Sequence, residues 1–157
     1  GLVGARSADL LAVTIPDPAA VPTDGSPSTA IEEFARHDLA SIVSTDDGTL
    51  GLHGLITDAL QRLLINQSPA EARRSVIYTC GPEPMMRSVA RLAAQYEIDA
   101  QACLEQAMAC GMGTCQSCIV QIEAQHAPHG TTAQGRPWRY RLACTDGPVF
   151  DTTNVIW

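Results

Sequence analysis

No lysine occurs in this 157-residue chain, so ten arginines provide its permanent positive side-chain charge against 17 acidic residues. The formal net charge is −7, and an acidic chain without a basic stripe is a poor candidate for binding nucleic acid. Aromatic side chains make up only 4% of the residues. No apolar run approaches the roughly 20 residues that a membrane-spanning helix needs. The apolar fraction of 45% is ordinary for a globular protein.

Cysteine, by contrast, is concentrated in the last third of the chain. Cys110, Cys115 and Cys118 are spaced C-x4-C-x2-C, and Cys144 follows after a long gap. This is the plant-type spacing of the thiolates that hold a 2Fe–2S cluster. The two glycines between the first two cysteines can take positive φ at no steric cost, which lets backbone N–H groups approach the sulfur atoms. The spacing therefore predicts a 2Fe–2S site.

The spacing leaves two other uses of these cysteines open. Structural zinc sites usually combine two separated CxxC-like knuckles, whereas this segment has one knuckle extended upstream by a four-residue gap. A non-enzymatic, zinc-stabilised interaction domain is the function that would follow. Disulfides need an oxidising compartment, and the sequence shows no recognisable secretory signal. Six cysteines in such a chain predict a reducing compartment, the cytoplasm, and a metal centre.

The rest of the pattern predicts an α/β protein. The apolar run at 39–44 indicates a buried strand and the run at 75–79 indicates the next strand, and the segments 55–65 and 83–95 indicate helices after them. Strands that alternate with helices are typical of βαβ units and a parallel sheet. A capping box at Thr29–Glu32 predicts a further helix that ends near His37.

The pattern changes near residue 97. Short strands are expected at 98–104, 118–125 and 140–143, with a polar loop at 126–138 between the last two. We therefore predict a partial parallel-sheet nucleotide-binding lobe at 1–97, which lacks its first strand and Gly-rich loop. A small β-rich 2Fe–2S cluster domain is predicted to follow at 98–157.

A second candidate site is the turn formed by Cys80, Gly81 and Pro82, where the strand at 75–79 passes into a helix. Open α/β sheets bind ligands at this kind of position, and the helix N-terminus favours phosphate. Gly81 permits close approach of a ligand to the backbone. Without further context, a tight strand-to-helix turn with a buried cysteine explains the same residues equally well.

Together the two motifs resemble the electron-transfer subunit of class 1B dihydroorotate dehydrogenase, a ferredoxin-reductase-like flavoprotein. The resemblance extends over nearly the whole chain except 14–28 and 125–138. The motifs that carry it are Gly4-Ala5-Arg6, Ser44-Thr45-Asp46-Asp47-Gly48-Thr49, Cys80-Gly81-Pro82-x-Pro84-Met85, Leu104-Glu105-x-x-Met108-Ala109-Cys110-Gly111-x-Gly113-x-Cys115-x-x-Cys118, Cys144-x-Asp146-Gly147-Pro148-Val149-Phe150 and Val155-Ile156-Trp157.

The resemblance implies a cofactor set and a partner. Members of this family carry FAD on a β-barrel domain, bind NAD on an α/β lobe and pair with a catalytic FMN subunit that oxidises dihydroorotate in pyrimidine biosynthesis. By this similarity the cluster ligands are Cys110, Cys115, Cys118 and Cys144. The residues implied to face the nucleotide or flavin are Gly4, Arg6, Asp46, Asp47, Gly48, Cys80, Gly81 and Pro82, with Cys80 as the candidate catalytic group.

Two departures from the family pattern limit what this chain is expected to do alone. The FAD barrel is absent, as is the Gly-rich loop that would grip a pyrophosphate. A cluster moves one electron at a time, whereas a nicotinamide accepts a hydride, so a flavin is needed between them. We expect the chain to be part of a longer protein or of a split one, and to need another polypeptide for NAD-linked turnover. A related NAD(P)H–ferredoxin or sulfide dehydrogenase-type reductase subunit is the alternative.

Overall fold

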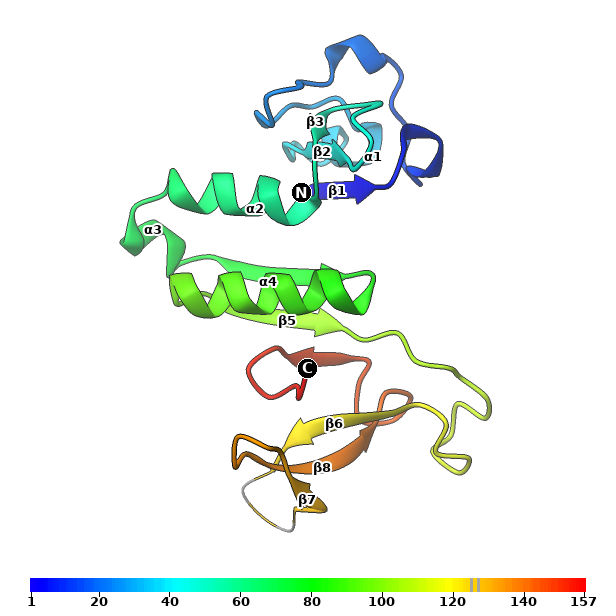
Figure 1. Cartoon of the computed structure of the whole chain (residues 1–157). Helices are drawn as coiled ribbons and strands as arrows, with labels where there is room; N and C mark the ends of the chain where they lie inside the picture. Colours follow the sequence, from blue (N-terminus) through cyan, green and yellow to red (C-terminus); the bar gives the residue numbers. More distant parts are fainter. Residues whose placement is uncertain (125, 127) are drawn as a thin grey trace. The chain divides into compact units, whose positions relative to one another are not determined.

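Strands and helices alternate along the first two thirds of the chain, as the hydrophobic pattern predicts (Figure 1). The computed structural model describes residues 1–124, 126 and 128–157, which divide into two units, Gly1–Gln67 and Ser68–Trp157. The strands are β1 (Leu2–Ala5), β2 (Ile42–Thr45), β3 (Leu52–His53), β4 (Val76–Cys80), β5 (Asp99–Cys103), β6 (Ile119–Glu123), β7 (Gly130–Thr131), β8 (Pro137–Leu142) and β9 (Val149–Asp151). The helices are α1 (Glu32–Ala35), α2 (Ile56–Ile65), α3 (Pro69–Ala72) and α4 (Glu83–Tyr96), with 3-10 turns at Ala8–Leu10 and Pro18–Ala20.

The first unit is built on a parallel sheet in the order β1-β2-β3. Every residue of the central strand β2 is buried, including the polar side chains of Ser44 and Thr45. Helix α2 lies against β1 and β2 and contributes Ala59 to a core with Ile42 and Leu52. A second cluster gathers Ile31 and Val43 with the loop residue Val21.

The second unit contains two sheets. In the first, β5 lies between β4, which is parallel to it, and β9, which is antiparallel, and α4 packs on β4 and β5. The second sheet is antiparallel in the order β6-β8-β7. One core joins the two sheets and the helix, formed by Met86, Ala102, Leu104, Val120, Ile122 and Val155. This core supports the segments that carry the cysteines.

The structure corrects several expectations. The Thr29–Glu32 capping box does not form: the helix starts after Ile31 without a side-chain cap and spans only Glu32–Ala35. Ser28 pairs instead with Ser41 in an isolated antiparallel bridge, which keeps the chain extended just before that helix.

The expected loop at 126–138 is also wrong in part, because it contains β7 and the start of β8. Residue 127 of that loop, and residue 125 at the end of the expected strand 118–125, lie outside the described residues. Strands β3 and β9 and helix α3 were not expected from the pattern.

The division between the units falls after Gln67, whereas the sequence places the functional boundary near residue 97. The expected strand at 75–79 pairs with β5 rather than with β2, so β4 and α4 belong to the second unit. The functional division into 1–97 and 98–157 stays a prediction. Within the part of the chain that the structure describes, no helix has the length and apolar character needed to cross a membrane.

Candidate functional site

The cysteine-rich loop leaves the end of β5 and enters β6. At its start, the Leu104 amide donates a 2.9 Å hydrogen bond to the Pro148 carbonyl oxygen, next to the turn that carries Cys144. At its end, the Ala143 amide donates a 2.9 Å bond to the Cys118 carbonyl oxygen. Both ends of the loop are therefore tied by backbone bonds to the segment around the fourth cysteine. Long-range strand pairing thus brings together cysteines that are distant in sequence.

The four predicted ligand thiols lie as two neighbouring pairs. The thiols of Cys110 and Cys115 influence each other's pKa, Cys118 likewise acts on the pKa of Cys144, and the charge of Cys110 also acts on Cys144. A two-iron core that takes two thiolates on each iron fits this arrangement. Within residues 1–124, 126 and 128–157, no three metal-binding side chains are close enough together to hold one metal ion. The pairing is thus the feature that fits a cluster, and the ligand set stays a prediction.

Backbone and hydroxyl groups act on the first pair of thiols. The amides of Met112 and Cys115 each approach Cys110 Sγ at 3.4 Å, and these bonds, the Cys115 amide first, lower the pKa of the Cys110 thiol. The Ser117 hydroxyl, 3.1 Å from Cys115 Sγ, is the main group that lowers the pKa of Cys115 to about 6. Such a site favours thiolates, which are the form that binds metal.

The Ser117 hydroxyl has two possible acceptors, since its oxygen also lies 3.0 Å from the Ala107 carbonyl oxygen. It has one hydrogen, so it serves one acceptor at a time. A protonated Cys115 can donate to Ser117 while Ser117 donates to Ala107. Once Cys115 is a thiolate, the hydroxyl can turn to it. Ser117 therefore favours the thiolate form of Cys115, which is one of the predicted ligands.

The second pair of thiols is less polar in its surroundings. Cys118 is buried, with 2% of its surface exposed, and Cys144 is half-buried. The hydrogen bond with Cys118 is the main cause that raises the pKa of Cys144, whereas a bond from the Gly113 amide acts in the opposite direction. Gly113 has φ +86°, and a side chain there would lie 3.4 Å from Leu142 and Thr145. Glycine thus suits the close approach of the loop to this segment.

The Cys80-Gly81-Pro82 turn lies at the carboxyl end of β4, as predicted. Gly81 has φ +150°, and a β-carbon there would lie 2.8 Å from Met85 Cε. Gly81 and Pro82 line a cavity of about 320 Å³ whose wall also includes Leu104 and Trp157. The Trp157 indole N–H donates a 3.1 Å bond to the Thr152 carbonyl oxygen, which fixes the indole at this wall.

Cys103 is a neighbour of the turn that the sequence does not reveal. It is half-buried and lies directly opposite Cys80 on the adjacent parallel strand. Cys80 is exposed, but partial desolvation of its thiol, and then the neighbouring Cys103, raise the pKa of Cys80. Cys80 is therefore held mainly as a thiol, which argues against a role as a thiolate nucleophile. Only the register of β4 on β5 could have predicted this pair.

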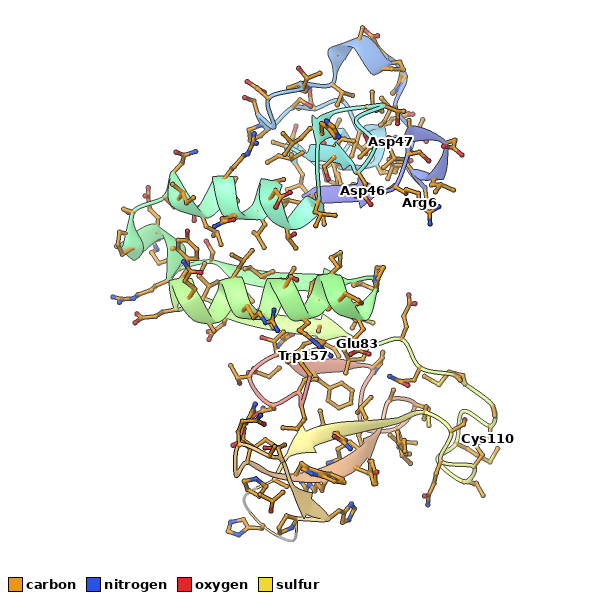
Figure 2. All side chains as sticks on the ribbon, viewed as in Figure 1. Arg6, Asp46, Asp47, Glu83, Cys110 and Trp157 are labelled. Atoms are coloured by element: carbon orange, nitrogen blue, oxygen red, sulfur yellow. The ribbon has the colours of Figure 1, made fainter. Side chains whose placement is uncertain are left out.

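In the first unit, the residues predicted to face a nucleotide lie in or just after β1 and β2, and Figure 2 shows Arg6, Asp46 and Asp47 at one edge of this sheet. The predicted residues are Gly4, Arg6, Asp46, Asp47 and Gly48. Strands β1 and β2 are parallel neighbours with Ala5 opposite Thr45, so the residues that follow the two strands meet. The carboxyl edge of a parallel sheet is where ligands bind in α/β proteins. The structure brings these five residues together, and their contact with a nucleotide stays a prediction.

Several polar groups at this edge already form hydrogen bonds with other residues of the same unit. The Asp46 amide donates to the Ala5 carbonyl oxygen at 3.0 Å. The Asp47 carboxylate accepts bonds from the hydroxyl and amide of Thr49 at 2.7 and 3.0 Å, and the hydroxyl contributes most to the lowered pKa of Asp47. A β-carbon on Gly4 would lie 2.7 Å from Ile56 Cβ, so this glycine is needed for packing. Arg6 is exposed and is the most available of the group for a ligand.

The cysteine-rich segment matches a known family. Residues 105–156 match the model of the iron–sulfur cluster binding domain of dihydroorotate dehydrogenase B. This part of the chain is therefore similar to that iron–sulfur domain. The matched range contains all four cysteines that the spacing selects and both of the thiol pairs. The resemblance inferred from the motifs is thereby confirmed.

Curated relatives extend the similarity over most of the chain. The electron-transfer subunit of dihydroorotate dehydrogenase B from Desulforamulus reducens is 31% identical over 80% of this chain and 42% of its own length. The subunit from Shouchella clausii is 34% identical over 73% of this chain and 37% of its own length. The probable subunit from Methanocaldococcus jannaschii is 34% identical over 69% of this chain and 34% of its own length. The chain thus spans less than half the length of these relatives.

A solved structure shows the same fold. The NADH-dependent reduced ferredoxin–NADP oxidoreductase structure superposes on 99% of this chain and 43% of its own, with a TM-score of 0.66 and 24% sequence identity. The α/β class expected from the sequence, with a parallel sheet and smaller β sheets, is therefore confirmed.

Proposed function

We propose that this chain holds a 2Fe–2S cluster on Cys110, Cys115, Cys118 and Cys144 and serves as the electron-transfer part of a dihydroorotate dehydrogenase B-type oxidoreductase. The observation that carries the proposal is the arrangement of these thiols as two pairs inside the matched iron–sulfur domain. The names of the curated relatives support the same assignment. When bound, the cluster would supply one-electron transfer.

The chain's own residues would prepare the site for this group. The amides of Met112 and Cys115 point hydrogen bonds at Cys110, and Ser117 does so at Cys115, which favours two thiolates before metal arrives. The buried Cys118 keeps water away from one side of the site. Hydrogen bonds to sulfur and burial are the main means by which a protein sets a cluster's reduction potential.

The same proposal places pyridine-nucleotide and flavin contacts at the two other groups of residues. Gly81 and Pro82 line the cavity of about 320 Å³, which is large enough for a planar ring, and Cys80 lies next to them as a neutral thiol. Gly4, Arg6, Asp46, Asp47 and Gly48 would meet NAD at the edge of the first sheet, with Arg6 the side chain most available. FAD would be carried by a further polypeptide or segment.

The proposed partner is a catalytic FMN-containing dihydroorotate dehydrogenase subunit, and the proposed setting is the cytoplasm. An NAD-linked flavoprotein reaction would therefore belong to the assembly rather than to this chain. The relatives named as dihydroorotate dehydrogenase subunits favour this partner over a ferredoxin or sulfide dehydrogenase system.

Anaerobic purification with iron and acid-labile sulfide analysis, followed by an EPR spectrum after dithionite reduction, tests the first part. About two irons and two sulfides per chain with a rhombic S = 1/2 signal are expected for a 2Fe–2S site. Zinc without sulfide would establish the structural alternative. Addition of dihydroorotate and the catalytic subunit should then bleach the visible absorbance, whereas no bleaching would point to a different partner.

A further inference from the structure

A second polar pocket lies on the cluster domain, apart from the predicted cluster ligands. Its volume is about 600 Å³, and its walls come from β6, β8, β9 and the segment after β9. Ile122 and Phe150 provide apolar surface, and Asn154 provides an amide. Arg139 and Arg141 alternate along β8 with Tyr140, so both project from the same face of the strand into this region.

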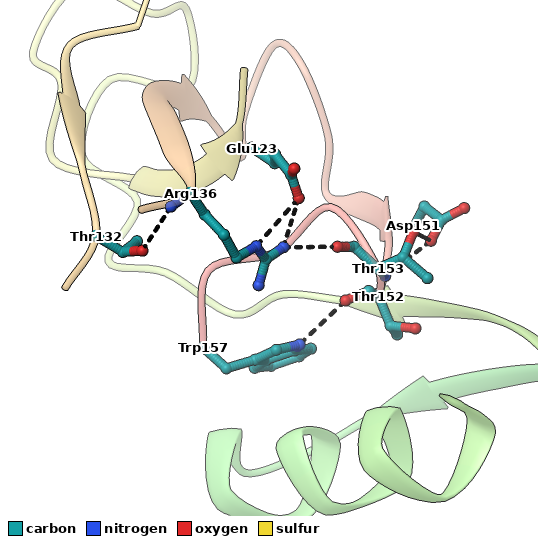
Figure 3. A network of polar contacts seen from close by, with 7 residues as sticks. All are labelled: Glu123, Thr132, Arg136, Asp151, Thr152, Thr153 and Trp157. Carbon is teal, nitrogen blue, oxygen red and sulfur yellow. Dashed lines mark hydrogen bonds and ion pairs between the residues drawn. The ribbon is translucent and has the colours of Figure 1, made fainter. Parts of the chain in front are cut away.

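The two carboxylates of the pocket, Glu123 and Asp146, already form ion pairs with arginines. Glu123 accepts a 2.6 Å bond from Arg136, whose guanidinium also donates to the Thr153 carbonyl oxygen at 3.0 Å (Figure 3). Asp146 accepts a 2.8 Å bond from the Leu142 amide and pairs with Arg141 at 3.3 Å. The two acidic side chains of the pocket thus each have a cationic partner of their own.

Arg139 is a pocket arginine that has no acidic partner among the described residues. It lies opposite the buried Ile122 in the β6–β8 register, and its Nε is buried. Among the residues that the structure describes, no side chain or backbone group accepts a hydrogen bond from this Nε, and no acid pairs with the guanidinium. A buried donor without an acceptor costs free energy, the more so when it carries a charge. Arg139 lines the pocket, where the acceptor oxygens of a ligand would pair with its charge.

From this arrangement we propose that the pocket binds a small oxyanion, a carboxylate or a phosphate group, with Arg139 as its main contact. The planar guanidinium fork matches the two oxygens of such a group. The Asn154 amide supplies a further donor, and Ile122 and Phe150 suit a compact organic part of the ligand. The site does not depend on the proposed electron transfer, because no cluster ligand lines it.

Titration of the full 157-residue chain with inorganic phosphate, and separately with acetate, tests the proposal by calorimetry. Ionic strength is held constant with chloride so that general screening does not change. Saturable binding of one phosphate or one acetate per chain is expected, and comparison of the two titrations tells which oxyanion class is preferred. The variant Arg139→Gln should weaken the preferred anion by about ten-fold or more, because a charge-assisted fork is lost.

Two further variants make the result specific. Arg74→Gln removes the same charge from an exposed arginine of the same unit and should leave binding unchanged. Asn154→Asp adds a negative charge to the pocket wall without changing Arg139 and should also weaken binding. This variant tests the proposal if Arg139→Gln does not fold. Absence of saturable binding by both anions would overturn the proposal, as would an equal loss in Arg139→Gln and Arg74→Gln.

Discussion

The amide of Ala143 donates a 2.9 Å hydrogen bond to the carbonyl oxygen of Cys118, and this bond joins the cysteine-rich loop to the segment that carries Cys144. The same two segments bring the thiol of Cys118 close enough to Cys144 to raise the pKa of Cys144. Backbone pairing between β6 and β8 therefore positions the fourth cysteine before any metal is present. The fold thus organises the segments that carry the proposed cluster ligands.

This organisation predicts that the cysteines differ sharply in their effect on metal content. Cys144→Ala should abolish the cluster, because one thiol pair loses its second member while the β6–β8 backbone is unchanged. Cys103→Ala, a matched change at a half-buried cysteine in β5, should keep about two irons per chain. Iron and sulfide analysis of the two purified variants gives the comparison. Equal loss in both would mean that the thiol pairs do not define the ligand set.

Gly4 is predicted to face a nucleotide, but its contact with α2 predicts that substitution there lowers stability through packing. A β-carbon at this position would lie 2.7 Å from Ile56 Cβ, so Gly4→Ala must displace α2 from β1. Overpacking of this kind costs about 2 kcal/mol of unfolding free energy. Arg6→Gln, at the exposed end of the same strand, should change that free energy by less than about 0.5 kcal/mol. Urea unfolding of both variants measures the difference. A Gly4→Ala variant as stable as the parent would show that the first unit repacks freely at this point.

The indole of Trp157 is expected to stabilise the second unit through its hydrogen bond to the Thr152 carbonyl oxygen. Trp157→Phe keeps an aromatic ring against the core but removes the donor, at a cost of about 1 kcal/mol. Trp138→Phe is the matched control, because no hydrogen bond from its indole is found among the described residues. Thermal unfolding should show a lower midpoint for the first variant than for the second. The reverse order would assign the role of Trp157 to packing alone.

Local patterns explain why so much of this protein was predictable. The helices α2 and α4 follow from apolar periodicity over ten and fourteen residues, and the structure places them close to where the sequence does. The cysteine loop is also a local signal, because three of its four thiols fall within nine residues. Such features depend on neighbours along the chain, which a sequence displays directly.

What the sequence did not reveal depends on pairing between distant segments. The capping box at Thr29–Glu32 was locally reasonable, but the bridge from Ser28 to Ser41 imposes an extended backbone there. Cys103 reads as an isolated apolar residue until β4 pairs with β5 and sets it opposite Cys80. Register of this kind is determined by the fold rather than by local composition, so neither feature could be read from spacing.

Acid should weaken the first unit through Glu33. Its carboxylate accepts the Thr14 amide at 3.0 Å on both oxygens, and bonds from the Thr14 hydroxyl and amide hold the pKa of Glu33 below its ordinary value of 4.5. Because the folded-state pKa is depressed, the contribution of Glu33 to stability is fully present above the unfolded value. It is lost as pH falls through the lower folded value. Glu33→Gln should therefore be less stable than the parent at neutral pH, and the gap should close as the pH falls below 4.5.

Urea unfolding of the parent, Glu33→Gln and Glu32→Gln across this pH range measures the effect. Glu32→Gln removes a charge from the same short helix but leaves both oxygens of Glu33 on the Thr14 amide, since Glu32 pairs with Arg36 instead. Its stability relative to the parent should not follow the Glu33 profile. A gap between the parent and Glu33→Gln that stays constant down to the lowest pH would show that the carboxylate charge is not what holds the segment around Thr14 to the helix.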